Sequence, residues 1–342
     1  MDGSTELSSE DLVTALKAAA EPTRLRILLL LATGELNVKD LTVILGQSQP
    51  RISRHLKLLS EAGLIERFRE GSWVYFHVSD RSAGGRLAMQ LVAASTASDI
   101  AVRRDRERAE ALKRERETTA QSFFEKNAAD WDQMRSLYVS EHDVENAMLS
   151  ALGHGPFNFF VDLGTGTGRT LELFAPRYKR SLGIDVNQSM LTYARAKLSK
   201  AGLATAQVRH GNIYALSLAN EQADAVVLNQ VLHFLSDPAL AVKEAARVLA
   251  PGGKLLIIDL APHDMEFLRE TQAHERLGFP HALVDQWLED AGLLPKITRD
   301  VVAPRTTRDE KKLTVTLWLA ERPQAAHPAA LAGTRSRLEE AR

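Results

Sequence analysis

The chain has 342 residues, a net charge of −1 at pH 7 and no cysteine. This length exceeds the usual size of a single hydrophobic core, so at least two domains are expected. The absence of cysteine excludes disulfides, thiolate metal ligands and cysteine nucleophiles, and the near-zero charge means that any nucleic-acid contact needs a local basic cluster.

Targeting and membrane-spanning features are absent from the sequence. The first residues lack the basic, then apolar, then small-residue order of a signal peptide, and no apolar run reaches the roughly 18 residues of a membrane span. The sequence therefore predicts a cytoplasmic protein with no membrane partner.

The chain begins with a pattern of short helices. Residues 1–10 are polar and are expected to be flexible. From 11 to about 45 the apolar residues recur at helical spacing, with breaks at Glu21-Pro22 and at Thr33-Gly34. A further helix is predicted over 48–59.

A β-hairpin is predicted next, because the stretches 64–68 and 73–78 alternate apolar and polar residues around a short turn. Short helices followed by a hairpin indicate an α+β winged helix-turn-helix, which we expect to occupy residues 11–98.

The helix predicted over 48–59 has a basic face. Ile52, Leu56 and Leu59 share the opposite face and are expected to be buried, and no acid occurs between positions 41 and 60. Such a surface suits a DNA major groove, and basic residues on the hairpin suit the phosphate backbone. The predicted DNA-binding residues are Gln49, Arg51, Ser53, Arg54, Lys57, Arg67 and Arg69.

Residues 12–80 resemble the winged helix-turn-helix of the ArsR family of bacterial repressors. The matching stretches are Glu21-Pro-Thr-Arg-Leu-Arg-Ile27, Val38–Leu45, Ser48-Gln-Pro-x-x-Ser-Arg-His-Leu56 and Glu61-Ala-Gly-Leu-Ile65. The resemblance implies binding to a double-stranded DNA operator as a homodimer. A winged helix that binds protein instead is the alternative.

Members of that family often sense metals through cysteines in a segment that aligns with residues 35–41. Here Asn37 and Lys39 fill those places, and a lysine would repel a cation. The sequence therefore predicts no metal site.

Residues 99–120 are expected to form a charged helical linker. Between positions 103 and 117, 12 of 15 residues are charged, and opposite charges four apart, such as Arg106 and Glu110, support a solvated helix. A coiled-coil or nucleic-acid-binding arm is the alternative, but apolar residues are too few for a seam.

Strands and helices alternate from residue 157 onward, which implies an α/β Rossmann-like doubly wound sheet in a domain spanning 121–322. A disordered tail is expected over 323–342. The predicted strands are 157–163, 181–186, 206–210, 223–228 and 254–260, with helices at 168–175, 188–201 and 238–249 and two closing antiparallel strands at 296–302 and 312–320.

The first of these strands runs into a glycine loop, Gly164-Thr-Gly-Thr-Gly168. A dinucleotide fingerprint would read G-x-G-x-x-G, whereas here Arg169 stands at the third glycine position. Asp162 precedes the loop, and its carboxylate would repel a pyrophosphate but suits a ligand that carries an ammonium and a sulfonium. The loop therefore favours S-adenosylmethionine, and a tight turn without a ligand is the alternative.

Three further elements follow in order. Asp185 ends the next strand, where an acid accepts hydrogen bonds from ribose hydroxyls. An amide in His210-Gly-Asn-Ile213 is placed to meet the adenine amino group. The turn Leu249-Ala-Pro-Gly-Gly-Lys-Leu255 leads into the fifth strand.

Residues 157–260 thus resemble a class I S-adenosylmethionine-dependent methyltransferase. The family commonly has Asp where Asn212 stands, although an amide can still bond the adenine. The cofactor-binding residues that the resemblance implies are Asp162, Gly164, Gly166, Gly168, Asp185, Val186, Asn212, Ile213 and Asn229.

The expected methyl acceptor is a small molecule. Without cysteine, cytosine-C5 methylation through a covalent adduct is excluded. The stretch Asn229-Gln-Val-Leu-His-Phe234 replaces the D/N/S-P-P-Y/F motif of adenine-N6 and cytosine-N4 methylases, and residues 231–238 resemble small-molecule methyltransferases, including the quinone-modifying type.

No catalytic residue stands out, and two histidines are weak candidates. His233 is either a base, part of the cofactor pocket or a packing residue. His274, next to Glu275, lies either in an acceptor loop or on a surface helix. The aromatic segment 123–132, with Arg135 and Tyr138, either caps the cofactor or packs as an ordinary helix.

Two functions remain open. In one, the chain is a transcriptional regulator fused to an enzyme that methylates a small molecule. In the other, the methyltransferase fold has become a non-catalytic sensor of S-adenosylmethionine or S-adenosylhomocysteine. The intact cofactor elements favour retained turnover.

Overall fold

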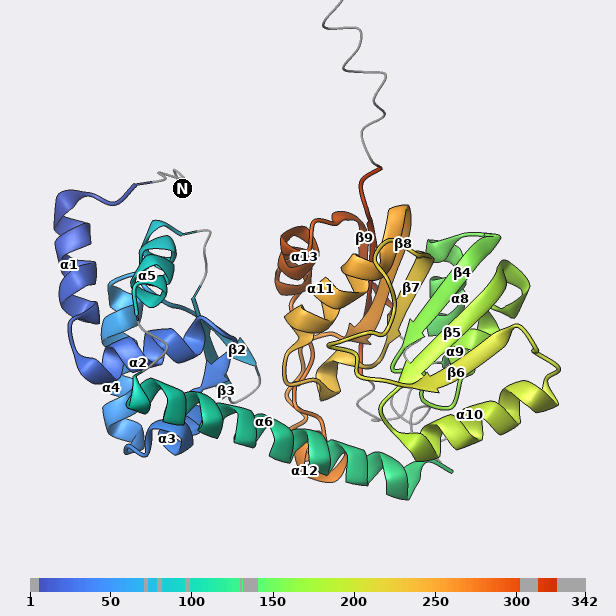
Figure 1. Cartoon of the computed structure of the whole chain (residues 1–342), viewed down its shortest axis with the longest axis horizontal. Helices are drawn as coiled ribbons and strands as arrows, with labels where there is room; N and C mark the ends of the chain where they lie inside the picture. The colour runs from blue at the N-terminus through green and yellow to red at the C-terminus, as the bar shows by residue number, and fades with distance from the viewer. Residues whose placement is uncertain are drawn as a thin grey trace, which may run out of the picture. The chain divides into compact units, whose positions relative to one another are not determined.

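A computed structural model describes residues 6–70, 73–78, 82–95, 99–129, 131, 141–301 and 313–324 (Figure 1). The chain divides into two compact units. Unit 1 consists of Met1–Phe123, Phe234–Asp237 and Pro262–Gly278, and unit 2 of Phe124–His233, Pro238–Ala261 and Phe279–Arg342. The tail expected over 323–342 lies outside the described residues from 325 onward.

Unit 1 begins with helices and a small antiparallel sheet, in which β3 lies between β1 and β2. This order confirms the winged helix-turn-helix that the sequence predicts. The elements are α1 (Ser9–Ala19), α2 (Pro22–Leu31), β1 (Leu36–Asn37), α3 (Val38–Leu45), α4 (Gln49–Glu61), β2 (Glu66–Glu70), β3 (Trp73–His77) and α5 (Ala83–Ala93).

The helix-turn-helix is formed by α3 and α4. A capping box starts α3, because the Asp40 amide donates to the Asn37 side chain at 3.0 Å and the Asn37 amide donates to the Asp40 carboxylate at 3.3 Å. Gly46 ends α3 in a left-handed conformation with φ of 63°. Helix α4 then packs its apolar side into the core through Ile52, Leu56 and Leu59.

Helix α6 (Ile100–Asn127) extends beyond the linker expected from the sequence. Its first half is not solvated on every side. Asp105 is buried and accepts two hydrogen bonds of 2.6 Å from the Arg26 guanidinium on α2. Arg108 donates to the carbonyl of Ile44 at the end of α3 at 3.0 Å. The helix therefore forms part of unit 1 along this half.

Unit 2 is built on a seven-stranded sheet in the order β6-β5-β4-β7-β8-β10-β9. Its elements are α8 (Glu141–Leu152), β4 (Phe157–Leu163), α9 (Arg169–Leu173), η1 (Ala175–Arg177), β5 (Tyr178–Asp185), α10 (Gln188–Lys200), β6 (Ala206–His210), β7 (Ala223–Asn229), η2 (Leu232–Phe234), α11 (Pro238–Val248), β8 (Leu249–Leu260), α13 (His281–Asp290), β9 (Leu294–Val301) and β10 (Val315–Glu321).

The sheet is parallel from β6 to β8, and β10 runs antiparallel to both β8 and β9. This topology confirms the Rossmann-like α/β fold and the two closing antiparallel strands. Helix α10 packs along β6 and β5, whereas α11 and α13 contact each other elsewhere on the sheet (Figure 1). Because the strands are parallel, the carboxyl ends of β4, β5, β6 and β7 lie at one edge, where a ligand site is expected.

Two features of the fold differ from the sequence expectation. The fifth strand begins earlier, at Leu249, and a register shift against β7 absorbs the Pro-Gly-Gly turn. Helices α8 and α13 were not predicted. Within the described residues, no helix combines the length and apolar character needed to cross a bilayer.

The burial of α4 yields a stability prediction. Ile52 has no exposed surface, so Ile52→Ala should cost about 2–5 kcal/mol through lost burial and the cavity left behind. Ser53→Ala, on the exposed side of the same turn, should stay within about 0.5 kcal/mol. Native-state hydrogen exchange of the α4 amides in the full chain measures both, and equal effects would contradict this packing.

Candidate functional site

The glycine loop folds back over the neighbouring strand. The amides of Gly164 and Thr165 both donate to the carbonyl of Ile184 on β5, at 2.8 and 3.1 Å. Gly164, Gly166 and Gly168 have φ values of 71°, 50° and 80°. Side chains other than glycine rarely adopt this left-handed backbone, so the turn depends on all three glycines.

Close approach also requires glycine at two places. A Cβ at Gly164 would lie 2.4 Å from Cγ2 of Val231, which follows β7, and a Cβ at Gly183 would lie 2.6 Å from Oγ1 of Thr165. The loop after β7 and the glycine loop are therefore in direct contact. A change at one must move the other.

Two carboxylates organise this edge of the sheet. Asp162 is 1% exposed and accepts a 2.6 Å hydrogen bond from the Thr165 hydroxyl. Asp185 accepts the Gly166 amide on one oxygen and the Asn187 amide on the other, each at 2.8 Å. Asp185 thus fixes the loop to the start of α10.

The surroundings of Asp185 shift the pKa of its carboxyl group. Burial raises the pKa of this carboxyl above its ordinary value, and the amides of Asn187, Gly166 and Val186 and the charge of His210 oppose the rise. A carboxylate in this setting is ready to accept further hydrogen bonds, since each of its oxygens has a second lone pair.

Val186, Asn212 and Ile213 lie close along the same edge. Val186 is 44% exposed directly after Asp185. The Gly211 amide donates to the Asp185 carbonyl at 3.0 Å, which places the next two residues at the end of β6. Asn212 is exposed, with its Oδ1 accepting the Tyr214 amide at 2.9 Å, and Ile213 is half-buried.

Asn229 lies at the carboxyl end of β7. Its Nδ2 donates to the Thr170 hydroxyl of α9 at 3.3 Å, while its Oδ1 is buried and has no hydrogen-bond partner in the part of the chain that the structure describes. A buried oxygen without a donor is costly, so it indicates a place for a ligand donor. Gln230, which follows, is left-handed with φ of 55°.

Trp131 covers the glycine loop. Its Nε1 lies 3.8 Å from the place of a Cβ on Gly166, and its ring meets Phe124 edge-on with centroids 5.1 Å apart. Trp131 thus lies beside the glycine loop and also packs against its own segment, so both interpretations of the aromatic segment stay open. The neighbours Asp130, Asp132, Arg135 and Tyr138 lie outside the described residues.

His233 is held by a buried acid that sequence reasoning missed. The side chain is 3% exposed, and its Nδ1 lies 2.7 Å from Oδ1 of Asp259, which is fully buried in β8. Asp259 also accepts the amides of Leu232 at 2.9 Å and of Leu260 at 2.8 Å. The sequence signal that could have identified Asp259 is its place as an acid inside an otherwise apolar stretch of strand.

His274 and Glu275 belong to unit 1. His274 packs edge-on against Phe234 with ring centroids 5.2 Å apart. Glu275 accepts a 2.6 Å hydrogen bond from Arg116 of α6. Burial raises the pKa of Glu275, and the nearby arginines oppose the rise. Glu275 therefore takes part in an ion pair within unit 1.

The predicted DNA-binding residues of α4 share its exposed side. Gln49, Arg51, Ser53, Arg54 and Lys57 are all exposed. Lys57 pairs with Glu61 one turn later, at 3.7 Å.

Arg67 and Arg69 are exposed on β2, and His55 faces inward from α4. Burial lowers the pKa of His55, with the arginines around it acting in the same direction and Glu21 against them. The positive charge on the exposed side of α4 therefore comes from arginine and lysine side chains and does not depend on His55.

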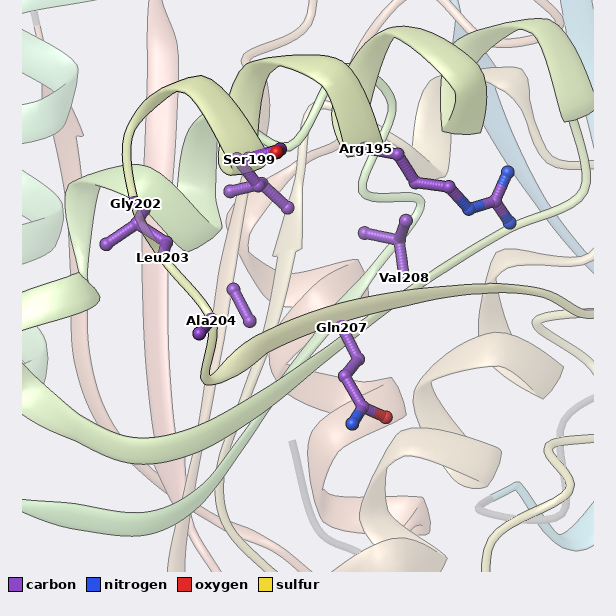
Figure 2. Close-up of a pocket in the computed structure, with 9 residues that line it drawn as sticks. Arg195, Ser199, Gly202, Leu203, Ala204, Gln207 and Val208 are labelled. Atoms are coloured by element: carbon purple, nitrogen blue, oxygen red, sulfur yellow. The ribbon is translucent and has the colours of Figure 1, made fainter.

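Metal ligands and surface hollows are the other features on which a site could be built. Among the described residues, no group of three or more His, Asp or Glu is arranged to hold a metal ion. Figure 2 shows a hollow between α10 and β6, lined by Arg195, Ser199, Leu203, Gln207 and Val208 among others. None of the predicted cofactor-binding residues lines this hollow.

Comparison with known proteins gives one family for each unit. Residues 21–67 match the family described as bacterial regulatory protein, arsR family, and residues 161–257 match the methyltransferase domain family. The chain therefore carries an ArsR-family helix-turn-helix and a class I methyltransferase domain.

Individual relatives each match one part. The arsenical resistance operon repressor of Escherichia coli (strain K12) is 53% identical over 64 residues, 18% of this chain and 55% of the repressor. The uncharacterized methyltransferase YcgJ of Bacillus subtilis (strain 168) is 30% identical over 105 residues, 30% of this chain and 42% of that protein. The chain thus spans about half or less of the length of these curated relatives.

A solved structure shows the same fold. A chain of the complex between the Haloferax volcanii Trm112 methyltransferase activator and the putative methyltransferase matches 59% of this chain over 98% of its own length. The TM-score is 0.51 and the sequence identity 20%, so the likeness concerns the fold.

The contact between Gly164 and Val231 can be tested by stability. Gly164→Ala should destabilise unit 2 by about 1–3 kcal/mol through the left-handed backbone and by about as much again through overpacking. Adding Val231→Ala should remove the second part, so the double variant should be more stable than the sum of the single changes. Calorimetric unfolding checks this, and strict additivity would contradict the contact.

Proposed function

We propose that this chain is a bacterial transcriptional regulator that binds operator DNA through its winged helix and S-adenosylmethionine through the carboxyl edge of its sheet, and that it methylates a small molecule. The observation that carries the proposal is the pair of carboxylates on the glycine loop. Asp162 precedes the loop, and Asp185 accepts the Gly166 amide at its centre. Negative charge here suits a cationic nucleoside and disfavours a pyrophosphate.

The residues present fit that cofactor. The remaining lone pairs of Asp185 accept the two ribose hydroxyls. Asn212 would accept a hydrogen bond from the adenine amino group, and Val186 and Ile213 would offer apolar surface to the ring. Buried Oδ1 of Asn229 has no partner among the described residues and accepts a donor from the amino-acid end of the cofactor.

Trp131 excludes water above the glycine loop. Its indole contacts the position of Gly166 and is braced by Phe124. Removing water strengthens the electrostatic interactions of the nearby carboxylates.

The methyl-transfer step requires an acceptor atom that has lost its proton. When bound, S-adenosylmethionine supplies an electrophilic methyl group. Asp259 accepts the Nδ1 proton of His233, so Nε2 is the basic nitrogen. In this role Nε2 of His233 would take up the proton that the acceptor atom loses, and Asp259 would stabilise the imidazolium so formed. The loops at the carboxyl ends of the strands would contribute by holding the reacting groups in position.

The winged helix acts as a homodimer on a double-stranded operator. Exposed apolar side chains gather on α1, where Leu12, Val13 and Leu16 are exposed, and Met89 on α5 adds another. Such surfaces favour association. A two-fold dimer presents α4 twice, so the expected operator is palindromic.

A second function is favoured by one observation. His233 is almost completely buried by its surroundings, which suits a packing role as well as a catalytic one. In that case unit 2 binds S-adenosylmethionine or S-adenosylhomocysteine without turnover, and the chain is a sensor.

Asp185→Asn should weaken S-adenosylmethionine binding by about 1–3 kcal/mol, because the variant loses charge-assisted hydrogen bonds. Burial raises the pKa of Asp185, so acidification protonates this carboxyl at a higher pH than an ordinary Asp. Affinity should therefore fall as the pH drops through that raised pKa, and the variant should lack this dependence.

Titration calorimetry across the pH range measures both effects. The matched control is Asp224→Asn, because Asp224 accepts the amide of Phe159 at 3.0 Å at the other end of the sheet. An unchanged affinity in Asp185→Asn would remove this residue from the site.

Turnover and sensing are separated by two measurements on the full chain. The first follows S-adenosylhomocysteine formation with fractions of a bacterial metabolite extract, where His233→Gln should abolish the activity. The second measures DNA binding with each form of the cofactor. Turnover with cofactor-insensitive DNA binding defeats the sensor function, and DNA release by cofactor without turnover defeats the enzyme function.

Arg54→Ala should weaken DNA binding about tenfold or more by gel shift, because one base or phosphate contact is worth about 1–3 kcal/mol. Affinity for S-adenosylmethionine should not change. Arg209→Ala, on exposed β6 of unit 2, serves as the control for lost positive charge. Equal losses in the two variants would argue against α4 as the recognition helix.

A further inference from the structure

Two segments leave the sheet after the strands that end at the candidate site, and both fold with unit 1. Phe234–Asp237 follows β7. Pro262–Gly278 follows β8, contains α12 (Phe267–Thr271), and is called the excursion here. Its base is closed by hydrogen bonds from the Phe279 amide to the Leu260 carbonyl at 2.8 Å and from the His263 amide to the Leu277 carbonyl at 3.0 Å.

The excursion inserts a buried arginine into the winged helix. Arg276 is 2% exposed, and its guanidinium pairs with Glu35 at 2.7 Å. The same group lies 4.1 Å from the ring centre of Tyr75, a buried residue of β3. Glu35 directly precedes β1, which pairs with β3. Removing one partner of a buried ion pair is strongly unfavourable, so Arg276 fixes both strands.

A second ion pair reaches the start of the helix-turn-helix. Arg116 of α6 donates to the carboxylate of Asp40 and also to Glu275 of the excursion, the latter at 2.6 Å. Asp40 is the buried residue that closes the capping box of α3. The N-terminus of α3 is thereby connected to the excursion through one guanidinium.

The wing has a further contact with the excursion. Arg269 lies 4.6 Å from the ring centre of Trp73, at the start of β3. Stacking of this kind on a tryptophan is the most favourable form of the cation–aromatic contact. The excursion therefore holds β3, the strand that pairs with β2 and its exposed Arg67 and Arg69.

The other ends of these segments are tied to the candidate site within unit 2. Val231 fills the space over Gly164. Asp259 then accepts the amide of Leu232 and the Nδ1 proton of His233, which are the last residues before Phe234, and also the amide of Leu260. One buried carboxylate thus holds the points at which both segments leave the sheet.

We propose that the excursion is an internal effector of the helix-turn-helix, through which an adenosine-type sulfur ligand at the glycine loop changes DNA affinity. The inference rests on the proposed function for the identity of the ligand and for DNA binding. A ligand that moves the glycine loop moves Val231, then the residues held by Asp259, and then the excursion. Its arginines transmit that movement to α3 and β3.

The test uses the full chain, S-adenosylhomocysteine, and a duplex selected by the wild-type protein from a randomised library. Fluorescence anisotropy gives the Kd for the duplex with and without saturating S-adenosylhomocysteine, and calorimetry gives the affinity for S-adenosylhomocysteine itself. The wild type should show a change in duplex Kd of about fivefold or more.

In Arg276→Met, the ratio of the duplex Kd values measured with and without S-adenosylhomocysteine should fall to within about twofold of one, because the variant removes the coupling between the two sites. Its affinity for S-adenosylhomocysteine should stay within about twofold of the wild-type value. Glu35→Gln should behave in the same way. Arg26→Met is the matched control, because it breaks an ion pair of 2.6 Å in unit 1 that does not involve the excursion. It should keep the wild-type ratio.

The outcomes are distinguishable. A wild type that binds neither S-adenosylhomocysteine nor any selected duplex defeats the proposed function. If the wild type binds both S-adenosylhomocysteine and a duplex, but its duplex Kd does not change with S-adenosylhomocysteine, the inference alone is wrong. The inference is also wrong if Arg276→Met shows the same change in duplex Kd as the wild type.

A measurement on the wild type covers the case in which the variants do not fold. S-adenosylhomocysteine should change the hydrogen-exchange protection of amides in α3 and β3 as well as in the glycine loop. Protection that changes in the loop and stays constant in α3 and β3 overturns the proposal.

Discussion

A single buried carboxylate, Asp259, holds the candidate site together. A charge without solvent must have its lone pairs satisfied, and Asp259 meets this requirement with His233 and the amides of Leu232 and Leu260. The loops after β7 and β8 are therefore fixed to each other. Val231, held in the first of these loops, packs on Gly164 and limits the shape of the glycine loop.

Arginine carries the corresponding role in unit 1. The segment in which the ArsR resemblance places metal-binding cysteines here contains Glu35 and Asp40, and each pairs with an arginine. A planar guanidinium can bond a carboxylate and lie over an aromatic ring at once, as Arg276 does with Glu35 and Tyr75. Ion pairs within the chain thus engage the same part of the helix-turn-helix.

Local patterns predicted most of the candidate site. The glycine loop, Asp185 and the strand β4 follow from short stretches of sequence, because positive φ, parallel strand order and helix starts are encoded within a few residues. The exposed basic side of α4 was predictable for the same reason, since helical spacing separates Ile52 from Arg54. The extent of α6 was not, because its charged residues suggested solvent where Asp105 is in fact buried against Arg26.

By itself, the sequence determined the two families, the order of their elements and the residues that line the glycine loop. The tertiary structure alone decided which distant residues meet: His233 with Asp259, Trp131 with Gly166, and Arg276 with Glu35. These contacts join residues far apart in the chain, and no periodicity or motif records them. For His233 with Asp259 and Arg276 with Glu35 the physical basis is the need of a buried charge for a partner, which only the folded chain can supply.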